Sequence, residues 1–238
     1  MDLLARERRP MHMAGVAAAL DLPKSSVHGL CNTLLSHGYL RRATNGALQI
    51  GPGVMTLAEA FVANTSVASE FDALWRDNAG PEETLILSVL NGAEVVYVAV
   101  RNSARPLGLA FNVGMRLTAY WAATGKAMLA FLEPAAVRTL LPRGPLPRLL
   151  GTGSLSQAAL RAELARTRER GYAIDDGCVR EGVYSIAAPI FDASGQPVAG
   201  IAVCVNKTAM KPDQMERQRE VVLQAARRLS QRLGARTP

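Results

Sequence analysis

Histidine is scarce in this chain and confined to one end. Of the 238 residues, three are histidine, and none of them lies beyond His37. A nucleophile such as Cys178 or Ser185 therefore has no histidine base in its own part of the chain. A zinc site there would have only scattered carboxylates and two thiols as ligands. These absences weigh against an enzyme that acts on a small molecule through the C-terminal part of the chain. They also weigh against a metal or cofactor site.

Cysteine and long apolar runs are also lacking. The three cysteines, Cys31, Cys178 and Cys204, are odd in number and widely scattered, so they indicate neither a disulfide framework nor a zinc motif. No apolar run approaches 18 residues, and the sequence predicts no membrane span. The opening residues, MDLLARERRPMHM, lack the apolar segment and cleavage site of a signal peptide. We therefore expect a cytoplasmic protein.

Acidic residues are outnumbered, but the excess of positive charge is spread along the chain. The formal net charge is +7, which permits a polyanionic partner without proving one. Residues 1–62 contain six Lys and Arg against four Asp and Glu, and the remainder contains 21 against 16. Binding to nucleic acid must therefore be inferred from the placement of groups and not from total charge.

What the first fifty residues do contain is a compact pattern of short elements. MAGVAAALDL is a small helix that ends at Leu22-Pro23, because the residue before proline disfavours helix. A second helix begins near Lys24 and ends at Gly38. Its residues Val27, Leu30, Leu34 and Leu35 are predicted to form one buried stripe. Two short strands then flank Asn45-Gly46, a dipeptide favoured by type I′ hairpins.

Two short helices followed by a hairpin make a winged helix-turn-helix, whose second helix enters the major groove of DNA. Its exposed face carries short polar side chains and no acid, so phosphate would not repel it. The wing adds two arginines suited to phosphate or the minor groove. The predicted contacts with double-stranded DNA are Lys24, Ser25, Ser26, His28, Asn32, Arg41 and Arg42.

Each of these residues also has an ordinary structural explanation. Ser25 or Ser26 can cap the helix, His28 can be a solvated side chain, and the arginines can be the charged face of a hairpin. Only their combination with the turn, the stripe and the wing favours DNA binding.

The rest of the chain predicts an α+β fold. Residues 53–68 have helical spacing and few charges, typical of a linker helix. Residues 84–101 and 184–206 read as two hairpins, which indicates an antiparallel sheet. Residues 122–132, 155–171 and 212–234 read as helices, and residues 141–154 as a surface loop. The predicted domains are residues 1–52, the linker 53–68, and residues 69–238.

Several stretches resemble the IclR-type family of bacterial transcriptional regulators. LDLPKSSVHGLCNTLLSHGYL is similar to the recognition segment of that family, and LQIGPGVMTLAEAF to its wing exit and linker helix. AATGKAMLAFL, ELARTRERGYAIDDG and GVYSIAAPIFDASGQPVAGIAV are similar to three stretches of its effector domain. The resemblance implies a GAF-like C-terminal domain that binds a small organic effector, a carboxylate or aromatic acid. It also implies homodimers or homotetramers on an operator.

The same resemblance implies where the effector binds. Carried over by position, the ligand-binding residues are Ala123 and Thr124 (through backbone N–H groups), Asp175, Val183, Ser185, Ala202 and Cys204. Free N–H groups at a helix start suit a carboxylate. Ala202 replaces a hydroxyl that some relatives have. Tyr120 and Trp121 stand where small residues or histidine are usual, and they either stack on an aromatic ligand or fill the core.

Two further enzymatic interpretations fail on the residues. TGKA is not the end of a phosphate-binding loop, because Tyr120 occupies the required first glycine and Ala127 replaces the magnesium-binding hydroxyl. Asp175 and Asp176 are adjacent on a predicted strand, so they point to opposite faces and do not cooperate. A pure interaction module that has lost DNA binding is the remaining alternative.

Overall fold

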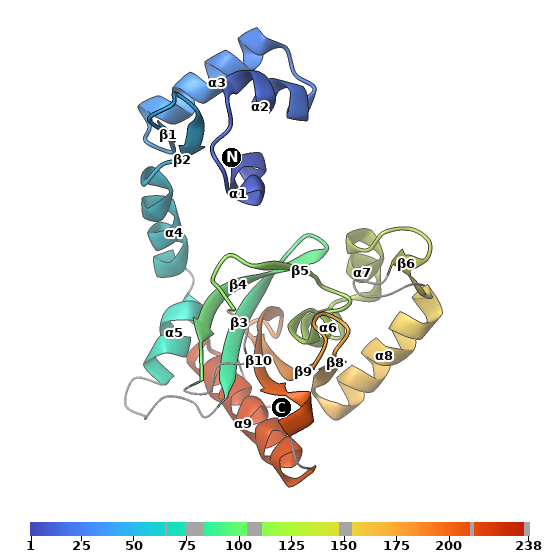
Figure 1. The fold of residues 1–238 in the computed structure, drawn as a ribbon. Coiled ribbons are helices and arrows are strands. Elements are labelled where there is room, and N and C mark those ends of the chain that lie inside the picture. Colours follow the sequence, from blue (N-terminus) through green and yellow to red (C-terminus); the bar gives the residue numbers. More distant parts are fainter. Residues whose placement is uncertain (65, 75–82, 104–110, 148–153, 210–211, 236–238) are drawn as a thin grey trace. The chain divides into compact units, whose positions relative to one another are not determined.

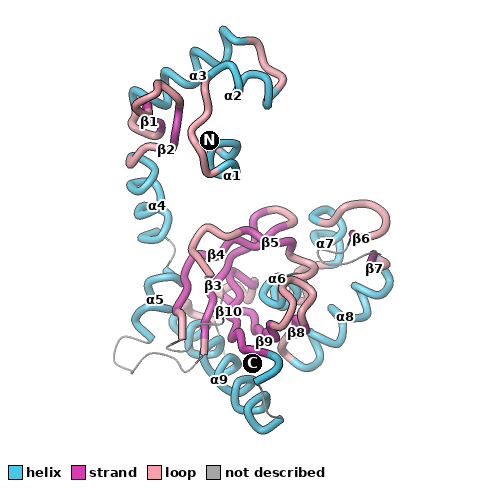
Figure 2. Tube along the Cα trace, viewed as in Figure 1, coloured by secondary structure: helices cyan, strands magenta, loops and turns pink. Residues whose placement is uncertain are grey.

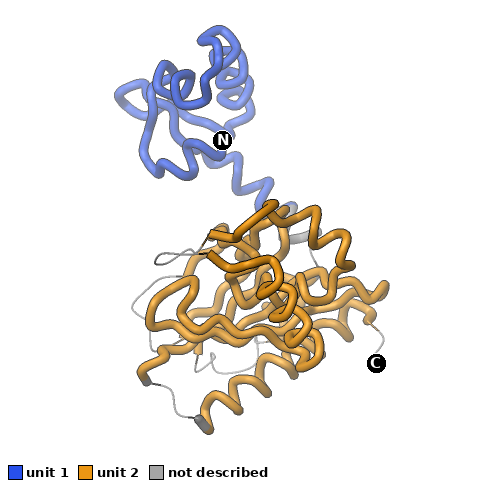
Figure 3. The backbone as a smooth tube through the Cα atoms, turned by 90° about the vertical axis from the view of Figure 1, so that its right-hand side faces the viewer, with its two compact units in different colours: residues 1–65 blue, residues 66–238 orange. Residues whose placement is uncertain are grey.

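The computed structural model describes residues 1–238 except 65, 75–82, 104–110, 148–153, 210–211 and 236–238. The chain divides into two compact units, residues 1–65 and residues 66–238, drawn in different colours in Figure 3. None of the described helices is long and apolar enough to cross a bilayer.

The first unit is built from short helices and a two-stranded hairpin (Figure 1). In chain order its elements are α1 (Asp2–Glu7), α2 (Met13–Leu20), α3 (Lys24–Ser36), β1 (Leu40–Arg42), β2 (Leu48–Ile50) and α4 (Gly53–Asn64). Helix α2 ends at Asp21, whose φ of 51° is left-handed, and Pro23 precedes the first turn of α3. This is the predicted winged helix-turn-helix, and the short helix α1 precedes it.

The core of this unit corrects the predicted stripe. Val27 and Cys31 of α3 are buried against Val16 and Leu48, whereas Leu30 is 58% exposed. Residues three and four positions after Val27 lie on either side of it on the helix surface, and here the core covers the side of i+4. The small Cys31 therefore takes the core position that the sequence pattern assigned to Leu30.

The wing is a hairpin of a different turn type from the one predicted. Leu40 pairs with Ile50 and Arg42 with Leu48. A type I′ turn needs positive φ at both central residues, but only Gly46 has it, at 77°. The Gly46 N–H donates to the Ala43 carbonyl at 2.9 Å, and the Ala43 N–H donates to the Ala47 carbonyl at 2.8 Å. This is the pattern of a longer loop with a bulge at glycine.

The segment predicted as a linker helix, residues 53–68, contains α4 and the start of α5 (Ser66–Leu74), which lie on either side of residue 65. Phe71 of α5 is completely buried, and α5 packs against the C-terminal helix α9 (Pro212–Arg232) of the second unit.

The second unit is a six-stranded antiparallel sheet with helices packed on it, and Figure 2 colours the strands magenta. The strand order is β5-β4-β3-β10-β9-β8. The strands span β3 (Thr84–Asn91), β4 (Glu94–Arg101), β5 (Arg116–Thr118), β8 (Ala173–Asp176), β9 (Val183–Phe191) and β10 (Pro197–Asn206). Both predicted hairpins are present, as β3–β4 and β9–β10.

Helices cover both faces of the central strands. The helices of this unit also include α6 (Ala123–Leu129), α7 (Pro134–Leu140), α8 (Gln157–Arg170) and the short η1 (Lys207–Ala209). Both α6 and α9 pack on β9 and β10, and nearly every residue of these strands is buried.

Small residues bring α6 close to the sheet. Ala123 and Ala127 of α6 contact Ala187 and Ala202 of the strands. A side chain at Gly200 would place its Cβ 2.9 Å from the Thr124 carbonyl oxygen. The close approach holds the start of α6 against β10, where the predicted effector site lies.

The predicted surface loop 141–154 is partly core. Leu146 is completely buried and Leu141 nearly so. Two short strands, β6 (Leu146–Pro147) and β7 (Ser154–Leu155), pair with each other. The frequent proline and glycine conceal these anchors in the sequence. Residues 148–153 of the predicted loop lie outside the described residues.

Candidate DNA-binding surface and effector cavity

The exposed face of α3 gathers the residues predicted to contact DNA. Lys24, Ser25, Ser26, His28 and Asn32 are all exposed. No aspartate or glutamate occurs anywhere in residues 22–58, which include α3 and the whole wing. A phosphate backbone brought against this segment would meet no like charge from it.

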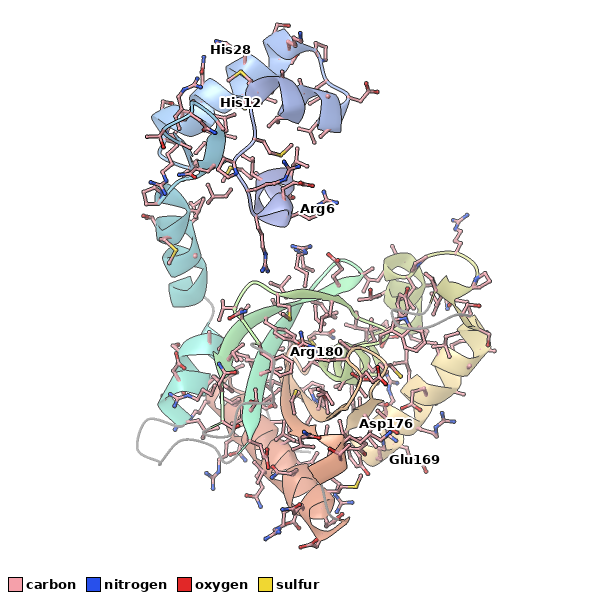
Figure 4. All side chains as sticks on the ribbon, viewed as in Figure 1. Arg6, His12, His28, Glu169, Asp176 and Arg180 are labelled. Atoms are coloured by element: carbon pink, nitrogen blue, oxygen red, sulfur yellow. The ribbon has the colours of Figure 1, made fainter. Side chains whose placement is uncertain are left out.

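Ser25 and Ser26, at the start of α3, do not cap the helix, which was the structural explanation for them. Pro23 occupies the N-cap position, and no side chain caps this end of the helix. His28, labelled in Figure 4, is exposed, and its Nδ1 lies 3.3 Å from Sδ of Met13 in α2.

The wing arginines are exposed and partly held in place. With its amide oxygen turned toward the guanidinium, Gln49 accepts hydrogen bonds from Arg41 Nε at 2.8 Å and from Nη2 at 2.9 Å. Arg42 donates from Nη1 to the Gly46 carbonyl at 3.2 Å. Both guanidinium groups keep further donors for a phosphate, since each has five N–H groups.

Gly29 was missed by the sequence reasoning. It lies four residues after Ser25, on the exposed face of α3, and a Cβ there would meet no atom of the protein within 4 Å. Glycine in a helix interior costs stability, so the fold gives no reason for it. A glycine at this point lets another molecule approach the helix backbone closely.

The seven residues predicted to bind the effector line one cavity in the second unit. It lies between the start of α6 and strands β8, β9 and β10. The remaining lining residues, which the sequence did not suggest, are Ile86, Tyr97, Phe111, Leu117, Ala122, Val179 and Arg180. All but Arg180 and the Tyr97 hydroxyl are apolar, so the walls are largely hydrophobic, as is usual for small-molecule sites.

The cavity is small as it stands. Its volume is about 20 Å³, roughly the space that one water molecule needs. An organic acid therefore requires the walls to separate by the movement of side chains or of the loop between β8 and β9.

The polar groups at the cavity are strongly affected by burial. Burial raises the pKa of Asp175, although its Oδ1 accepts a hydrogen bond from the Cys178 N–H at 2.8 Å. Burial also lowers the pKa of the neighbouring Lys126, whose Nζ donates to the Ile174 carbonyl. Ser185 donates from Oγ to Sγ of Cys204 at 3.3 Å. Asp175 and Lys126 therefore each favour the neutral form more than in water.

Tyr120 and Trp121 belong to the core. Both are buried in the main cluster of the second unit, and neither lines the cavity. The Trp121 Nε1–H donates to the Pro147 carbonyl at 2.8 Å, so the ring anchors β6. Of the two interpretations of this pair, the structure supports core packing.

The features that favour an enzyme do not come together. Asp175 is buried, whereas Asp176 is exposed and pairs with Lys207 at 2.8 Å, so the two acids point to opposite sides as predicted. Burial raises the pKa of Cys204 to about 12, and a thiol in that state is a poor nucleophile. Among the described residues, no group of three potential metal ligands is found.

Comparison with known proteins identifies both units. The family model "Bacterial transcriptional regulator IclR C-terminal" matches residues 70–231, and the "IclR helix-turn-helix domain" matches residues 1–44. The regulator BhcR of Paracoccus denitrificans is 30% identical over 97% of this chain and 83% of its own.

Two solved structures are also similar. The repressor BlcR of Agrobacterium tumefaciens is 38% identical, with a TM-score of 0.62 over 99% of this chain and 94% of its own. An IclR homologue of Microbacterium hydrocarbonoxydans, complexed with 4-hydroxybenzoate, is 22% identical, with a TM-score of 0.73 over 95% and 92%.

The chain belongs to the IclR family of transcriptional regulators, because the effector-domain model alone covers more than half of it. It is a regulator with a helix-turn-helix DNA-binding domain and a C-terminal effector-binding domain.

Proposed function

We propose that this protein binds a specific operator in double-stranded DNA and that a small organic acid controls the binding. The observation that carries the proposal is the exposed, acid-free face of α3 followed by an arginine-bearing wing. In this arrangement Ser25, Ser26 and Asn32 contact base edges, while Lys24, Arg41 and Arg42 contact phosphates.

The effector site is the cavity at the start of α6. Its polar groups converge from α6, β8, β9 and β10 within apolar walls, which is the composition of a site for a small partly apolar ligand. A carboxylate or an aromatic acid fits the proposal, and the related homologue bound to 4-hydroxybenzoate gives one example of the class. Entry of the ligand widens the cavity, so the site is coupled to a change of conformation.

Coupling between the two sites requires more than one copy of the chain. In a homodimer or homotetramer, the effector favours one arrangement of the effector domains, residues 69–238. The linker, residues 53–68, transmits that arrangement to the DNA-binding domains, residues 1–52. Two recognition helices related by a two-fold axis would read half-sites about 34 Å apart or a multiple of that distance.

The protein acts in the cytoplasm and catalyses no reaction. All histidines lie before residue 38, and the buried thiol of Cys204 has a pKa raised by burial. The predicted nucleophiles, Cys178 and Ser185, therefore have no histidine base in their own unit.

The experiment is a selection of operators from a random duplex library, followed by fluorescence anisotropy with and without small acids. A regulator gives salt-sensitive binding to the selected sequence, and an acid changes the affinity. Turnover of an acid in the absence of DNA supports the enzyme instead. Partner binding with no selected sequence supports the interaction module.

A further inference from the structure

Arg180 is a cation held in the wall of the effector cavity. It lies in the loop between β8 and β9, near the centre of the second unit in Figure 4. Its guanidinium carbon is 5.0 Å from the centre of the Phe111 ring, which also lines the cavity. Its Nη1 atom is enclosed, and within the described part of the chain this nitrogen has no hydrogen-bond partner.

Arg101 and Arg219 of the second unit also have an enclosed nitrogen without a hydrogen-bond partner, Nε in each case, but the guanidinium groups of both contact an acid. Arg101 contacts the Asp72 carboxylate at 3.8 Å, and Arg219 pairs with Glu216. Arg168 also lies over an aromatic ring, but it donates from Nε to the Ala130 carbonyl at 2.6 Å. Within the described residues, the Arg180 guanidinium is paired with no carboxylate, and it lies over the face of Phe111 and close to Tyr97 and Cys204 in the cavity wall.

A guanidinium nitrogen that is enclosed without a hydrogen-bond partner is costly, and an anion that accepts from it removes much of that cost. A guanidinium group also matches the planar, two-oxygen geometry of a carboxylate better than a lysine does. The ring of Phe111 holds the guanidinium in place, so little side-chain freedom is lost when an anion binds.

We propose that Arg180 selects the effector by pairing with its carboxylate. This inference rests on the proposed role of the cavity as the effector site and makes it more specific. The effector is an acid with a second polar group, because Asp175, Ser185 and Thr124 also line the cavity. That second group is a hydroxyl or carbonyl and not a second carboxylate, because Arg180 is the one cationic side chain among the described residues that line the cavity and a second carboxylate would have no cation to pair with.

The test compares acids with their uncharged counterparts on the full-length protein at pH 7. The probes are acetate, glycolate, succinate and 4-hydroxybenzoate, each beside its primary amide. Thermal shift and calorimetric titration are run on the wild type, Arg180→Gln and Arg180→Lys. We expect glycolate or 4-hydroxybenzoate to bind the wild type and its amide not to. Arg180→Gln should weaken that binding roughly 10- to 100-fold, the usual loss of one charge-assisted contact, and Arg180→Lys should restore part of it.

Arg168→Gln is the matched control, because Arg168 is an arginine of the same unit with a ring contact and carbonyl partners. Without ligand, Arg180→Gln should leave the melting temperature unchanged or raise it, and Arg168→Gln should lower it. Arg168→Gln should keep the wild-type response to acids.

Equal shifts for acids and amides, no shift with any probe, or acid binding undiminished in Arg180→Gln would overturn the assignment. A fall in melting temperature equal to that of Arg168→Gln, with acid binding kept, would show a structural role. Operator binding is measured on the same samples. Its absence in the wild type contradicts the regulator proposal alone, because acid binding is read without DNA.

Discussion

Replacing Gly29 by alanine should change stability and DNA affinity in opposite directions. A Cβ at this position meets nothing in the protein within 4 Å, and alanine in a helix interior is about 0.8–1.0 kcal/mol more favourable than glycine. The first unit should therefore gain close to 1 kcal/mol. Hydrogen exchange of the α3 amides in the full chain measures that gain, because local protection reports this unit separately from the sheet domain.

The same methyl group should hinder DNA. Gly29 is on the face that carries Ser25 and Asn32, so the added group projects toward the base edges. Overpacking a close contact costs about 1–3 kcal/mol, which is roughly a 5- to 150-fold loss of affinity. Fluorescence anisotropy with the selected operator provides the measurement.

Gly15→Ala is the matched control. Gly15 is an exposed helical glycine in α2, and its Cβ would meet only Met11 Cε at 3.9 Å. It should gain similar stability and keep its affinity within about twofold, because it is not on the recognition helix. If Gly29→Ala gains stability and binds the operator as tightly as Gly15→Ala, the close approach of DNA to α3 is refuted.

Two further substitutions test the second unit. Asp175→Asn keeps the acceptor for the Cys178 N–H but removes the charge. Burial raises the pKa of Asp175 above its ordinary 3.8 in the folded protein. The stability of the wild type should therefore fall relative to that of Asp175→Asn as pH rises from 3.8 through the raised pKa, and it should stay lower above that pKa. Parallel denaturant titrations at several pH values would contradict this if the two proteins kept a constant difference. Trp121→Phe loses the bond to the Pro147 carbonyl, which should cost about 0.5–1.5 kcal/mol and leave the acid response intact; an altered acid response would return Trp121 to the effector site.

Local sequence patterns predicted the elements well where each had its own start and stop signals. Pro23 and Gly38 bound α3, and Gly171 ends α8 in a left-handed conformation. The prediction that Leu30 is buried was wrong because either Leu30 or Cys31 can lie beside Val27 in a buried stripe. Packing of the first unit buries the smaller Cys31. The predicted turn type was wrong because a type I′ turn needs positive φ at both central residues, and only Gly46 has it.

The effector cavity could be only half predicted. Seven lining residues follow from the resemblance, because they lie on strands and a helix whose register the motifs specify. Arg180 could not be found in that way. It lies in an irregular loop, and nothing in a sequence distinguishes an arginine folded over Phe111 from a solvated one. Its enclosure depends on the path of the loop between Gly177 and Gly182, both at positive φ.

The most direct measurement is the operator affinity of Ser26→Glu beside the wild type, with Ser154→Glu as the control at an exposed serine of the other unit. A carboxylate set against phosphates costs several kcal/mol. We therefore predict a loss of roughly 100-fold or more for Ser26→Glu, with acid binding unchanged and Ser154→Glu equal to the wild type. Undiminished operator binding by Ser26→Glu would contradict the placement of α3 in the major groove.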